Sequence, residues 1–433
     1  MTSKILLTGG CVLTLGTKTP NFPRADVLID GGVVAEIGIG LRARDAEQVD
    51  ATDTIVLPGF VDTHRHAGAS LSRNLGEPEQ GRSRDPDRAE DVYAATLIGL
   101  LGAIEAGITT VADWSFLRSD DTLVEAALQA HADAGLRTVF VHPARHPMRD
   151  REERDAIHQR FARLAEAVGQ STSIALGCSV AASTELREIE DDRALARELG
   201  LRLHLHEGSG APKPGTVAEL AGRGILDRDV TLVHHSSLDA GDVEAIASSG
   251  AAVSLAPWSD MASGVGTPPI QPLIDRDIRP GLGVDEELIT PGDLFAQMRA
   301  TISMQHAIVF DRKLAGKAGV PRLMSTRDVI RHATVDGARA IGLGSVTGSL
   351  EPGKHADIVM LRTDRPNVFP INDPIGAVVW GMDTSNVDWV FVGGRPVLRG
   401  GVLEANVDRA RTLAAAAGRH LATAAPGTSA ADR

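Results

Sequence analysis

The chain has 433 residues, of which 43% are hydrophobic and 23% are charged, as in ordinary globular proteins. Its formal net charge is -13, which argues against nucleic acid or an anionic membrane as a partner, because both require clustered Lys and Arg. No run approaches the ~18 apolar residues of a membrane span, and the N-terminus does not resemble a signal peptide. The two cysteines, Cys11 and Cys178, predict neither a disulfide framework nor a thiolate metal site. We expect a cytoplasmic protein with a small-molecule substrate.

Both ends of the chain consist of strand-and-turn sequence. Glycine pairs close short apolar runs at Val27–Gly32 and at Trp389–Gly394, which is typical of tight hairpins. We therefore expect residues 1–57 and 355–405 to form one small composite β-domain. The tail, residues 406–433, is rich in Ala and Arg, and it is expected to be helical to about Ala424 and disordered beyond.

Residues 58–354 repeat one pattern, in which a short apolar run ends in polar or small residues and is followed by a loop and a helical segment. Several of these segments, such as Asp91–Ala106 and Leu186–Leu199, are followed by a C-capping glycine. Eight such units predict a (β/α)8 TIM barrel, with a doubly wound open sheet as the alternative. The predicted strands are Ile55–His64, Thr109–Asp113, Arg137–His142, Ile174–Ser179, Leu201–His206, Val230–His235, Ala251–Pro257 and Gly281–Asp285.

Polar side chains that suit a metal ion end four of these strands. His64 and His66 follow the first run at i and i+2, so a strand would place both imidazoles on one face. Strand 5 brings His204, His206 and Glu207, strand 6 brings His234 and His235, and strand 8 brings Asp285. Because the C-terminal ends of barrel strands meet at one face, three His and one Asp there would suit Zn²⁺ or Fe²⁺ and leave a position for water.

Five segments together resemble the amidohydrolase superfamily, and within it the branch of cytosine deaminases, adenosylhomocysteine deaminases and triazine hydrolases. The similarity runs from about residue 4 to residue 405, and it implies a TIM barrel flanked by a composite β-sandwich. The strand pattern leads to the same architecture independently. The segments are Pro58–His66, Ala106–Val111, Val233–His235, Gly283–Asp285 and Gly348–Val359.

The resemblance also bears on the number of metal ions. Superfamily members with two metals usually bridge them with a carboxylated Lys at the end of strand 4. Here the corresponding run, Ile174–Ser179, contains no Lys, and none of the six lysines falls on a predicted barrel strand. We therefore expect one divalent ion, Zn²⁺ or Fe²⁺, held by His64, His66, Asp285 and one histidine of strand 5.

The strand-5 ligand stays open between two histidines. Deaminases of this branch carry a metal-binding His followed three residues later by a Glu that moves protons. His204 with Glu207 satisfies this spacing, whereas His206 would put Ser209 in the place of the acid. Strand alternation does not decide, because residues 204 and 206 share a face. We favour His204, since hydrolysis of a ring amine needs a proton donor; with His206 as ligand, the role of Glu207 is in doubt.

The resemblance implies further roles around the metal. His234 would stabilise charge on the attacking oxygen, whereas His235 points the other way and is assigned a structural role. Trp114, His142 and Trp258 end strands 2, 3 and 7 and are candidates for binding the substrate, with packing as the alternative.

Four neighbouring features receive simpler interpretations. Asp62 is expected to brace the strand or a histidine, as carboxylates behind metal ligands do. Arg65 and Arg73 are open between an acidic substrate group and plain solvation. The Gly76–Arg88 segment is expected to be a loop over the site.

The sequence therefore predicts a metal-dependent hydrolase of C–N bonds that deaminates an amino-substituted N-heterocycle, with Glu207, His234 and Asp285 as catalytic residues. The alternative is hydrolysis of another leaving group, such as chloride, alkylamine or an amide, on the same mononuclear site. A non-catalytic barrel is disfavoured because none of the expected ligands is missing. The resemblance also implies a homo-oligomer.

Overall fold

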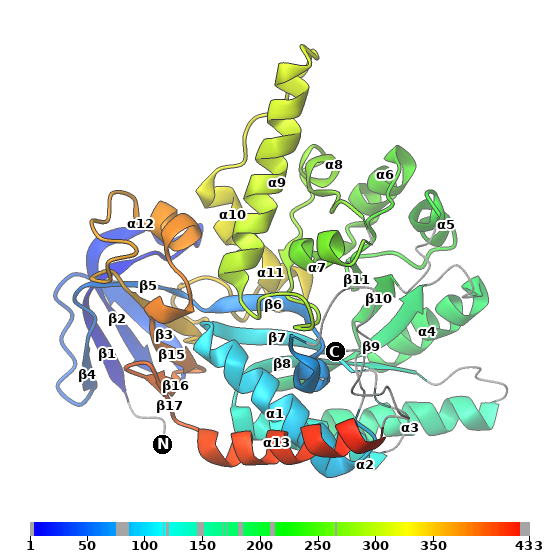
Figure 1. The fold of residues 1–433 in the computed structure, drawn as a ribbon, viewed down its shortest axis with the longest axis horizontal. Coiled ribbons are helices and arrows are strands. Elements are labelled where there is room, and N and C mark those ends of the chain that lie inside the picture. Colours follow the sequence, from blue (N-terminus) through cyan, green and yellow to red (C-terminus); the bar gives the residue numbers. More distant parts are fainter. Residues whose placement is uncertain are drawn as a thin grey trace, which may run out of the picture.

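The structure is a computed structural model, and it describes residues 4–74, 86–115, 117, 121–144, 151–167, 169, 171–180, 185–207, 213–264 and 266–424. Two sheets organise these residues (Figure 1). An eight-stranded parallel sheet curls into a nearly closed barrel, and a nine-stranded, mostly antiparallel sheet lies beside it. The described chain thus consists of a TIM barrel and a β-sandwich, as predicted.

The barrel strands follow one another in chain order, each paired in parallel with the next. Large apolar side chains from alternate positions, among them Val61, Trp114 and Val141, fill the barrel interior. The strands are β6 (Phe60–Arg65), β7 (Ile108–Trp114), β8 (Arg137–Pro143), β9 (Thr172–Val180), β10 (Leu203–Glu207), β11 (Val230–Val233), β12 (Ala252–Leu255) and β13 (Gly281–Leu282).

The second sheet joins both ends of the chain, because β14 from the C-terminal part pairs with β5 from the N-terminal part. It encloses a core of its own that includes Ile5, Val27, Ile358 and Phe391. Its strands are β1 (Ile5–Val12), β2 (Phe22–Asp30), β3 (Val33–Gly38), β4 (Glu47–Asp50), β5 (Thr54–Pro58), β14 (Ile358–Arg362), β15 (Val387–Val392), β16 (Arg395–Arg399) and β17 (Val402–Leu403).

Helices surround the barrel, and α9 extends well beyond it at the top of Figure 1. The long C-terminal helix α13 packs against α1. The described helices are η1 (Ala67–Ser72), α1 (Ala89–Glu105), α2 (Asp121–Ala134), α3 (Arg151–Ala167), α4 (Leu186–Leu199), α5 (Thr216–Gly222), α6 (Ala240–Ser249), α7 (Pro257–Ala262), α8 (Ile270–Ile274), α9 (Leu294–Leu314), α10 (Thr326–His332), α11 (Val335–Ala340), α12 (Pro374–Gly376), η2 (Ala377–Gly381), η3 (Thr384–Asn386) and α13 (Val407–Ala424).

Several predicted strands differ from the structure: strand 6 ends at Val233 and strand 7 at Leu255, both short of the predicted ends, and the first and last strands differ most. The run predicted as Ile55–His64 is two strands, since β5 ends at Pro58 in the sandwich and β6 starts at Phe60 in the barrel. Strand 8 ends at Leu282, before Asp285, which has a left-handed backbone with φ of +67° and pairs with Arg65 in an isolated bridge. Within the described residues no helix combines the length and the apolar character needed to span a bilayer. Residues 76–85 of the expected loop, and tail residues 425–433, lie outside the described part.

Candidate metal centre

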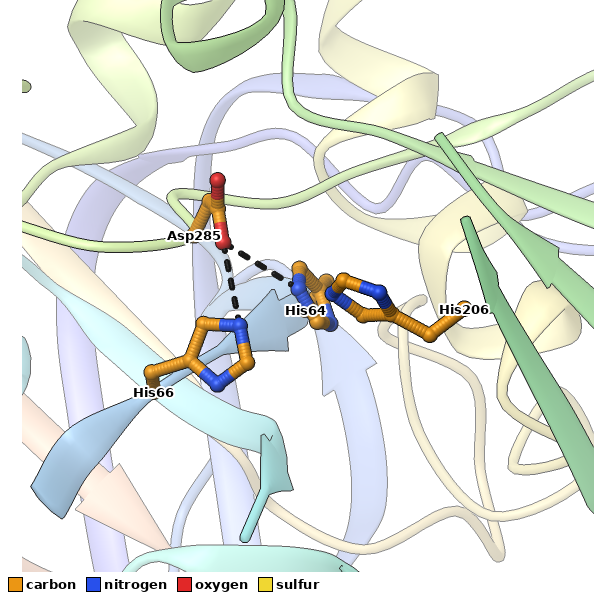
Figure 2. A group of neighbouring side chains, drawn as sticks. All are labelled: His64, His66, His206 and Asp285. Atoms are coloured by element: carbon orange, nitrogen blue, oxygen red, sulfur yellow. Dashed lines mark ion pairs between the residues drawn. The ribbon is translucent and has the colours of Figure 1, made fainter. Parts of the chain in front are cut away.

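Four side chains from three parts of the barrel converge at the C-terminal ends of its strands (Figure 2). They are His64 on β6, His66 just after it, His206 on β10 and Asp285 after β13. Each offers one ligand atom, and these four atoms lie within 4.8 Å of one another. The geometry therefore brings together three imidazoles and one carboxylate, as the sequence predicts for a metal centre.

Asp285 lies closest to the two histidines of β6. Its Oδ1 is 3.2 Å from Nε2 of His64 and 3.2 Å from Nε2 of His66, and the dashed lines in Figure 2 mark both contacts. Two atoms that each bind Zn²⁺ at about 2.1 Å in a tetrahedral site lie roughly 3.4 Å apart. The spacing of these three residues therefore fits a shared divalent ion.

The protonation states also fit a cation. Burial lowers the pKa of His64 to about 3 and holds the pKa of His206 well below 6.5, so both rings are neutral at pH ~7. Nδ1 of His66 lies 3.0 Å from the carbonyl oxygen of Trp114. Because a carbonyl only accepts, Nδ1 carries a proton and Nε2 faces Asp285. Burial disfavours the charged ring of His66, but the hydrogen bond and charge of Asp285 outweigh burial and raise its pKa, so Nε2 would release a proton when it binds a metal ion. Burial opposes ionisation of Asp285, but hydrogen bonds with His64 and His66 outweigh it and keep the pKa of Asp285 well below its ordinary value.

The choice between the two histidines of strand 5 is where the structure differs from our preference. His206, the alternative, belongs to the group of four, and His204 does not. Both side chains share the inner face of β10, but His206 lies one pleat nearer the C-terminal end, where the other ligands gather. His204 is buried deeper in the barrel, and its Nε2 has no hydrogen-bond partner in the described part of the chain. The His-x-x-Glu spacing that favoured His204 does not indicate how far along the barrel axis each histidine lies.

Glu207 lies beside the centre, not in it. Its Oε2 accepts a hydrogen bond of 2.8 Å from the backbone N–H of Ser236, and its Oε1 is buried without a hydrogen-bond partner among the described residues. Burial raises the pKa of Glu207, which brings this carboxyl closer to the range where it can give and take protons near neutrality. Ser209, the alternative acid position, lies outside the described residues.

His234 faces the group from the end of β11. Its ring centroid is 4.9 Å from that of His64 and 4.8 Å from that of His206. Nδ1 of His234 lies 2.7 Å from Oδ1 of Asp260 on α7. Burial disfavours the charged ring, but the charge and hydrogen bond of Asp260 outweigh burial and raise the pKa of His234 to about 9. His234 is therefore a cation at pH ~7 and can donate a hydrogen bond into the site.

Two contacts of the site and one feature of its backbone were not predicted from the sequence. Asp260 was not singled out, although an acid in a short apolar segment after a barrel strand is a usable signal. Ser259 Oγ donates to Oδ2 of Asp285, and nothing in the sequence marks it. His234, His235 and Asp285 all have positive φ, which costs about 1–3 kcal/mol per non-glycine residue and often marks a functional site.

The three aromatic candidates for substrate binding have different surroundings. Trp114 is buried, lies 4.8 Å from the ring of His206, and forms with His66 part of the wall of a cavity of about 250 Å³. Trp258 is the second residue of α7, the helix that also carries Ser259 and Asp260, and its side chain is 39% exposed. His142 differs, since it stacks on Phe140 and contacts Phe161 of α3. It lies in the layer between barrel and helices, away from the group of four.

The remaining assignments concern structural side chains. Nδ1 of His235 lies 2.9 Å from the carbonyl oxygen of Val233, and the ring is buried, in keeping with a structural role. Oδ1 of Asp62 accepts from the backbone N–H of His64 at 3.3 Å, so Asp62 braces the strand as expected. Arg65 is wholly buried, which rules out plain solvation of this side chain.

Comparison with known proteins identifies the class. The model of the amidohydrolase family matches residues 55–397, which cover both the barrel and its junction with the sandwich. The chain therefore belongs to the amidohydrolase family and is a hydrolase. The fold and the three-histidine, one-aspartate group agree with that family and with a divalent metal ion.

Two relatives by sequence carry the names of deaminases. The chain is 27% identical to a 5'-deoxyadenosine deaminase of Methanothermobacter thermautotrophicus, over 92% of this chain and 94% of the relative. It is 28% identical to a 5-methylthioadenosine/S-adenosylhomocysteine deaminase of Halobacterium salinarum, over 96% of this chain and 100% of the relative.

Solved structures share the fold. An atrazine chlorohydrolase of Arthrobacter aurescens, complexed with zinc, superposes with a TM-score of 0.82 at 21% identity, covering 96% of this chain and 100% of that one. An adenosine deaminase of Xanthomonas campestris with bound zinc gives a TM-score of 0.80 at 19% identity, covering 97% and 98%. At these identities the likeness supports the fold alone.

Proposed function

We propose that this chain is a zinc- or iron-dependent aminohydrolase that removes the exocyclic amino group of an N-heterocycle, with adenosine-like purine nucleosides as the first substrates to test. The observation that carries the proposal is the group of His64, His66, His206 and Asp285, with a protonated His234 and the partly free carboxyl of Glu207 beside it. The names of the two deaminase relatives support the choice of substrates.

In this proposal His64, His66, His206 and Asp285 hold one divalent ion. When bound, such an ion lowers the pKa of a water molecule toward ~7 and so supplies a nucleophile at neutral pH. Asp285 accepts a proton from the attacking water at its carboxylate. Glu207 gives its proton to the ring nitrogen, takes up the remaining proton of the attacking oxygen and passes it to the leaving amine. The proton held by Asp285 then returns to Glu207 for the next turnover. Protonated His234 donates to the attacking oxygen as negative charge develops on it.

The overall change balances as a hydrolysis. The ring carbon loses its bond to the amino nitrogen and gains a C=O bond. One proton of the water ends on the ring nitrogen, and the other ends on the amine, which leaves as ammonia. A protonated Glu207 is needed at the start, and the raised pKa of this buried carboxyl meets that need.

Hydrolysis of another leaving group, such as chloride, an alkylamine or an amide, is the second candidate. It is favoured by one observation, namely that the position three residues after His206 is Ser209, not the Glu expected of a deaminase. A leaving group that departs as an anion, such as chloride, needs no proton donor. The chlorohydrolase among the structural neighbours makes halogenated triazines suitable probes.

The test combines elemental analysis of the purified protein with ammonia release from a panel of purine nucleosides, aminopurines, aminopyrimidines, pterins and triazines. About one Zn or Fe per chain, with ammonia from one ring class, is the expected result. One metal per chain with release of chloride or alkylamine and no ammonia would favour the second candidate. No metal after reconstitution would contradict both.

We also propose that the chain forms a homo-oligomer in the cytoplasm. Light scattering of the purified protein tests the oligomeric state.

A further inference from the structure

Arg65 lies between two of the proposed metal ligands in the sequence, but its side chain enters a separate, buried network. It is 0% exposed, although it carries a permanent positive charge. Its Nε donates to Oδ2 of Asp62 at 2.7 Å, its Nη1 lies 3.2 Å from Oε1 of Glu287, and its Nη2 donates to the carbonyl oxygen of Gly292 at 2.8 Å. A charge so deeply buried is costly unless its partners compensate it, and here two carboxylates do so.

Both carboxylates reach the segment that carries Asp285. Oδ1 of Asp62 accepts a hydrogen bond of 3.0 Å from the backbone N–H of Val284, one residue before Asp285. Glu287 follows Asp285 by two residues. The guanidinium of Arg65 therefore links β6 to the segment on both sides of Asp285, through Asp62 on one side and Glu287 on the other.

Glu287 is held from a third direction as well. Its Oε2 accepts from Oγ of Ser70 at 3.0 Å and from Nε of Arg73 at 2.8 Å. Nη2 of Arg73 also lies 2.7 Å from Oε2. These contacts make Glu287 a fixed point between η1 and the segment after β13.

The barrel closes where its last strand, β13, meets its first strand, β6. Few backbone hydrogen bonds join the two strands there. β13 has only two residues, Gly281 and Leu282, and both pair with β12. Backbone pairing of this segment with β6 consists of one isolated bridge, in which Asp285 N donates to His64 O at 2.9 Å and His66 N donates to Asp285 O at 3.3 Å. Asp285 also holds a left-handed backbone with φ of +67°. The surroundings must therefore fix a conformation that a non-glycine residue rarely adopts.

We propose that Arg65 is a positioning residue for the metal centre: its guanidinium holds Asp62 and Glu287 together, and so fixes the Asp285 carboxylate between His64 and His66. The inference rests on the proposed metal site, and it adds a residue that touches neither the metal nor the substrate. Since Lys cannot reproduce the three-way fork of a guanidinium, Arg65→Lys keeps the charge but releases at least one of the anchors.

The chain offers a matched control in Arg137 on β8. Its Nε and Nη2 donate to Asp357 at 2.6 and 3.1 Å, and both side chains are buried. This pair has the same chemistry but joins the barrel to the sandwich. Arg137→Lys should therefore disturb a buried ion pair without disturbing the metal centre.

The experiment compares zinc affinity, measured by competition with a chromophoric chelator, with thermal unfolding of the metal-free proteins. We expect Arg65→Lys to weaken zinc binding about 10- to 100-fold, as loss of supporting contacts to ligands does elsewhere. Arg137→Lys should lower the melting temperature and leave zinc affinity unchanged. Equal zinc affinity for wild type and Arg65→Lys, or equal weakening in both variants, would overturn the proposal.

Two further measurements keep the outcomes distinct. If Arg65→Lys does not fold, Glu287→Gln removes the same anchor with a side chain of the same shape, and the same loss of zinc affinity is expected; normal affinity overturns the inference. A wild-type protein that binds no metal would contradict the proposed function. A wild-type protein that binds one zinc, with equal zinc affinity in Arg65→Lys, would contradict only the role of Arg65.

Discussion

Nδ1 of His234 lies 2.7 Å from Oδ1 of Asp260, and both side chains are buried. Because Asp260 overcomes the effect of burial, the pKa of His234 is raised to about 9, and the ring remains a cation across the neutral range. The left-handed backbone of His234 fixes the direction of the ring. This pair gives the site a hydrogen-bond donor whose charge is stabilised chiefly by Asp260, with smaller contributions from Asp285 and Glu207.

We expect Asp260→Asn to move the alkaline limb of the pH profile of kcat to lower pH. His234 is active when protonated, so wild-type activity should fall as pH rises through about 9. Without the Asp260 charge, burial lowers the pKa of His234, and the fall should begin below that value. At pH ~8 we expect a loss of about 10²–10³-fold, the cost of removing a donor to a developing oxyanion.

The matched control for this prediction is Asp328→Asn. Asp328 is also an ion-paired aspartate, but it bonds Arg322 and caps α10, so its loss should leave the pH profile in place. An unchanged alkaline limb in Asp260→Asn would contradict the assigned role of His234.

Replacing each of the two strand-5 histidines in turn should have opposite effects on the metal content of the protein. His206→Ala should reduce bound zinc to below about half an equivalent per chain after dialysis, because His206 is one of the four gathered ligands. His204→Ala should retain about one equivalent, since its ring lies outside the group of four. Inductively coupled plasma mass spectrometry of the two variants, purified in parallel, distinguishes them. Full metal content in His206→Ala together with loss in His204→Ala would restore the original preference.

The sequence predicted those parts of the site that follow from strand periodicity. His64 and His66 were found because alternate residues of a strand share a face and because barrel strands deliver their last residues to one end. Asp285 was found because it follows an apolar run, although the strand itself stops at Leu282. Periodicity could not separate His204 from His206, since both lie on the same face and differ only in height.

Contacts between side chains from distant segments could not be predicted from the sequence. The burial of Arg65 depends on Glu287, which a different barrel strand delivers, and the charge of His234 depends on Asp260. His142 follows an apolar strand just as the ligands do, yet alternation turns it toward Phe161 and the helix layer. Such outcomes are decided by tertiary packing, which a single sequence does not specify at this level.

Glu207→Gln tests the proton carrier directly. The amide keeps the size and can still accept the hydrogen bond from Ser236 N–H, but it has no carboxyl proton to give. If the reaction is deamination, kcat should fall about 10²–10⁴-fold, the usual contribution of a general acid, with little change in zinc content. Initial rates of ammonia release with zinc-saturated protein measure this.

Ser209→Ala is the companion variant, because Ser209 stands three residues after His206, the spacing at which the family resemblance implies an acid. It should retain kcat within about threefold if Glu207 carries the proton, on the ground that general acid catalysis accounts for far larger effects. A larger loss in Ser209→Ala than in Glu207→Gln would reverse the assignment.

Asp285→Asn should abolish turnover while leaving the fold intact. Asn has nearly the shape of Asp and can still receive the hydrogen bond from Ser259 Oγ, so the segment after β13 keeps its packing. It cannot accept a proton from water at neutral pH, and it lacks the charge that balances a divalent ion beside His64 and His66. We expect kcat to fall by at least about 10³-fold.

Circular dichroism and thermal unfolding should show that Asp285→Asn remains folded, and assays at saturating zinc separate lost metal from lost chemistry. Ser259→Ala is the control at the same carboxylate. It removes one hydrogen bond to the ionised carboxylate and should reduce kcat about 10- to 100-fold, less than Asp285→Asn, since a bond to a charged group contributes about 1.5–3 kcal/mol. If zinc-saturated Asp285→Asn kept activity within tenfold of wild type, Asp285 could not be the residue that accepts the water proton, and the carboxyl of Glu207 would be the next candidate.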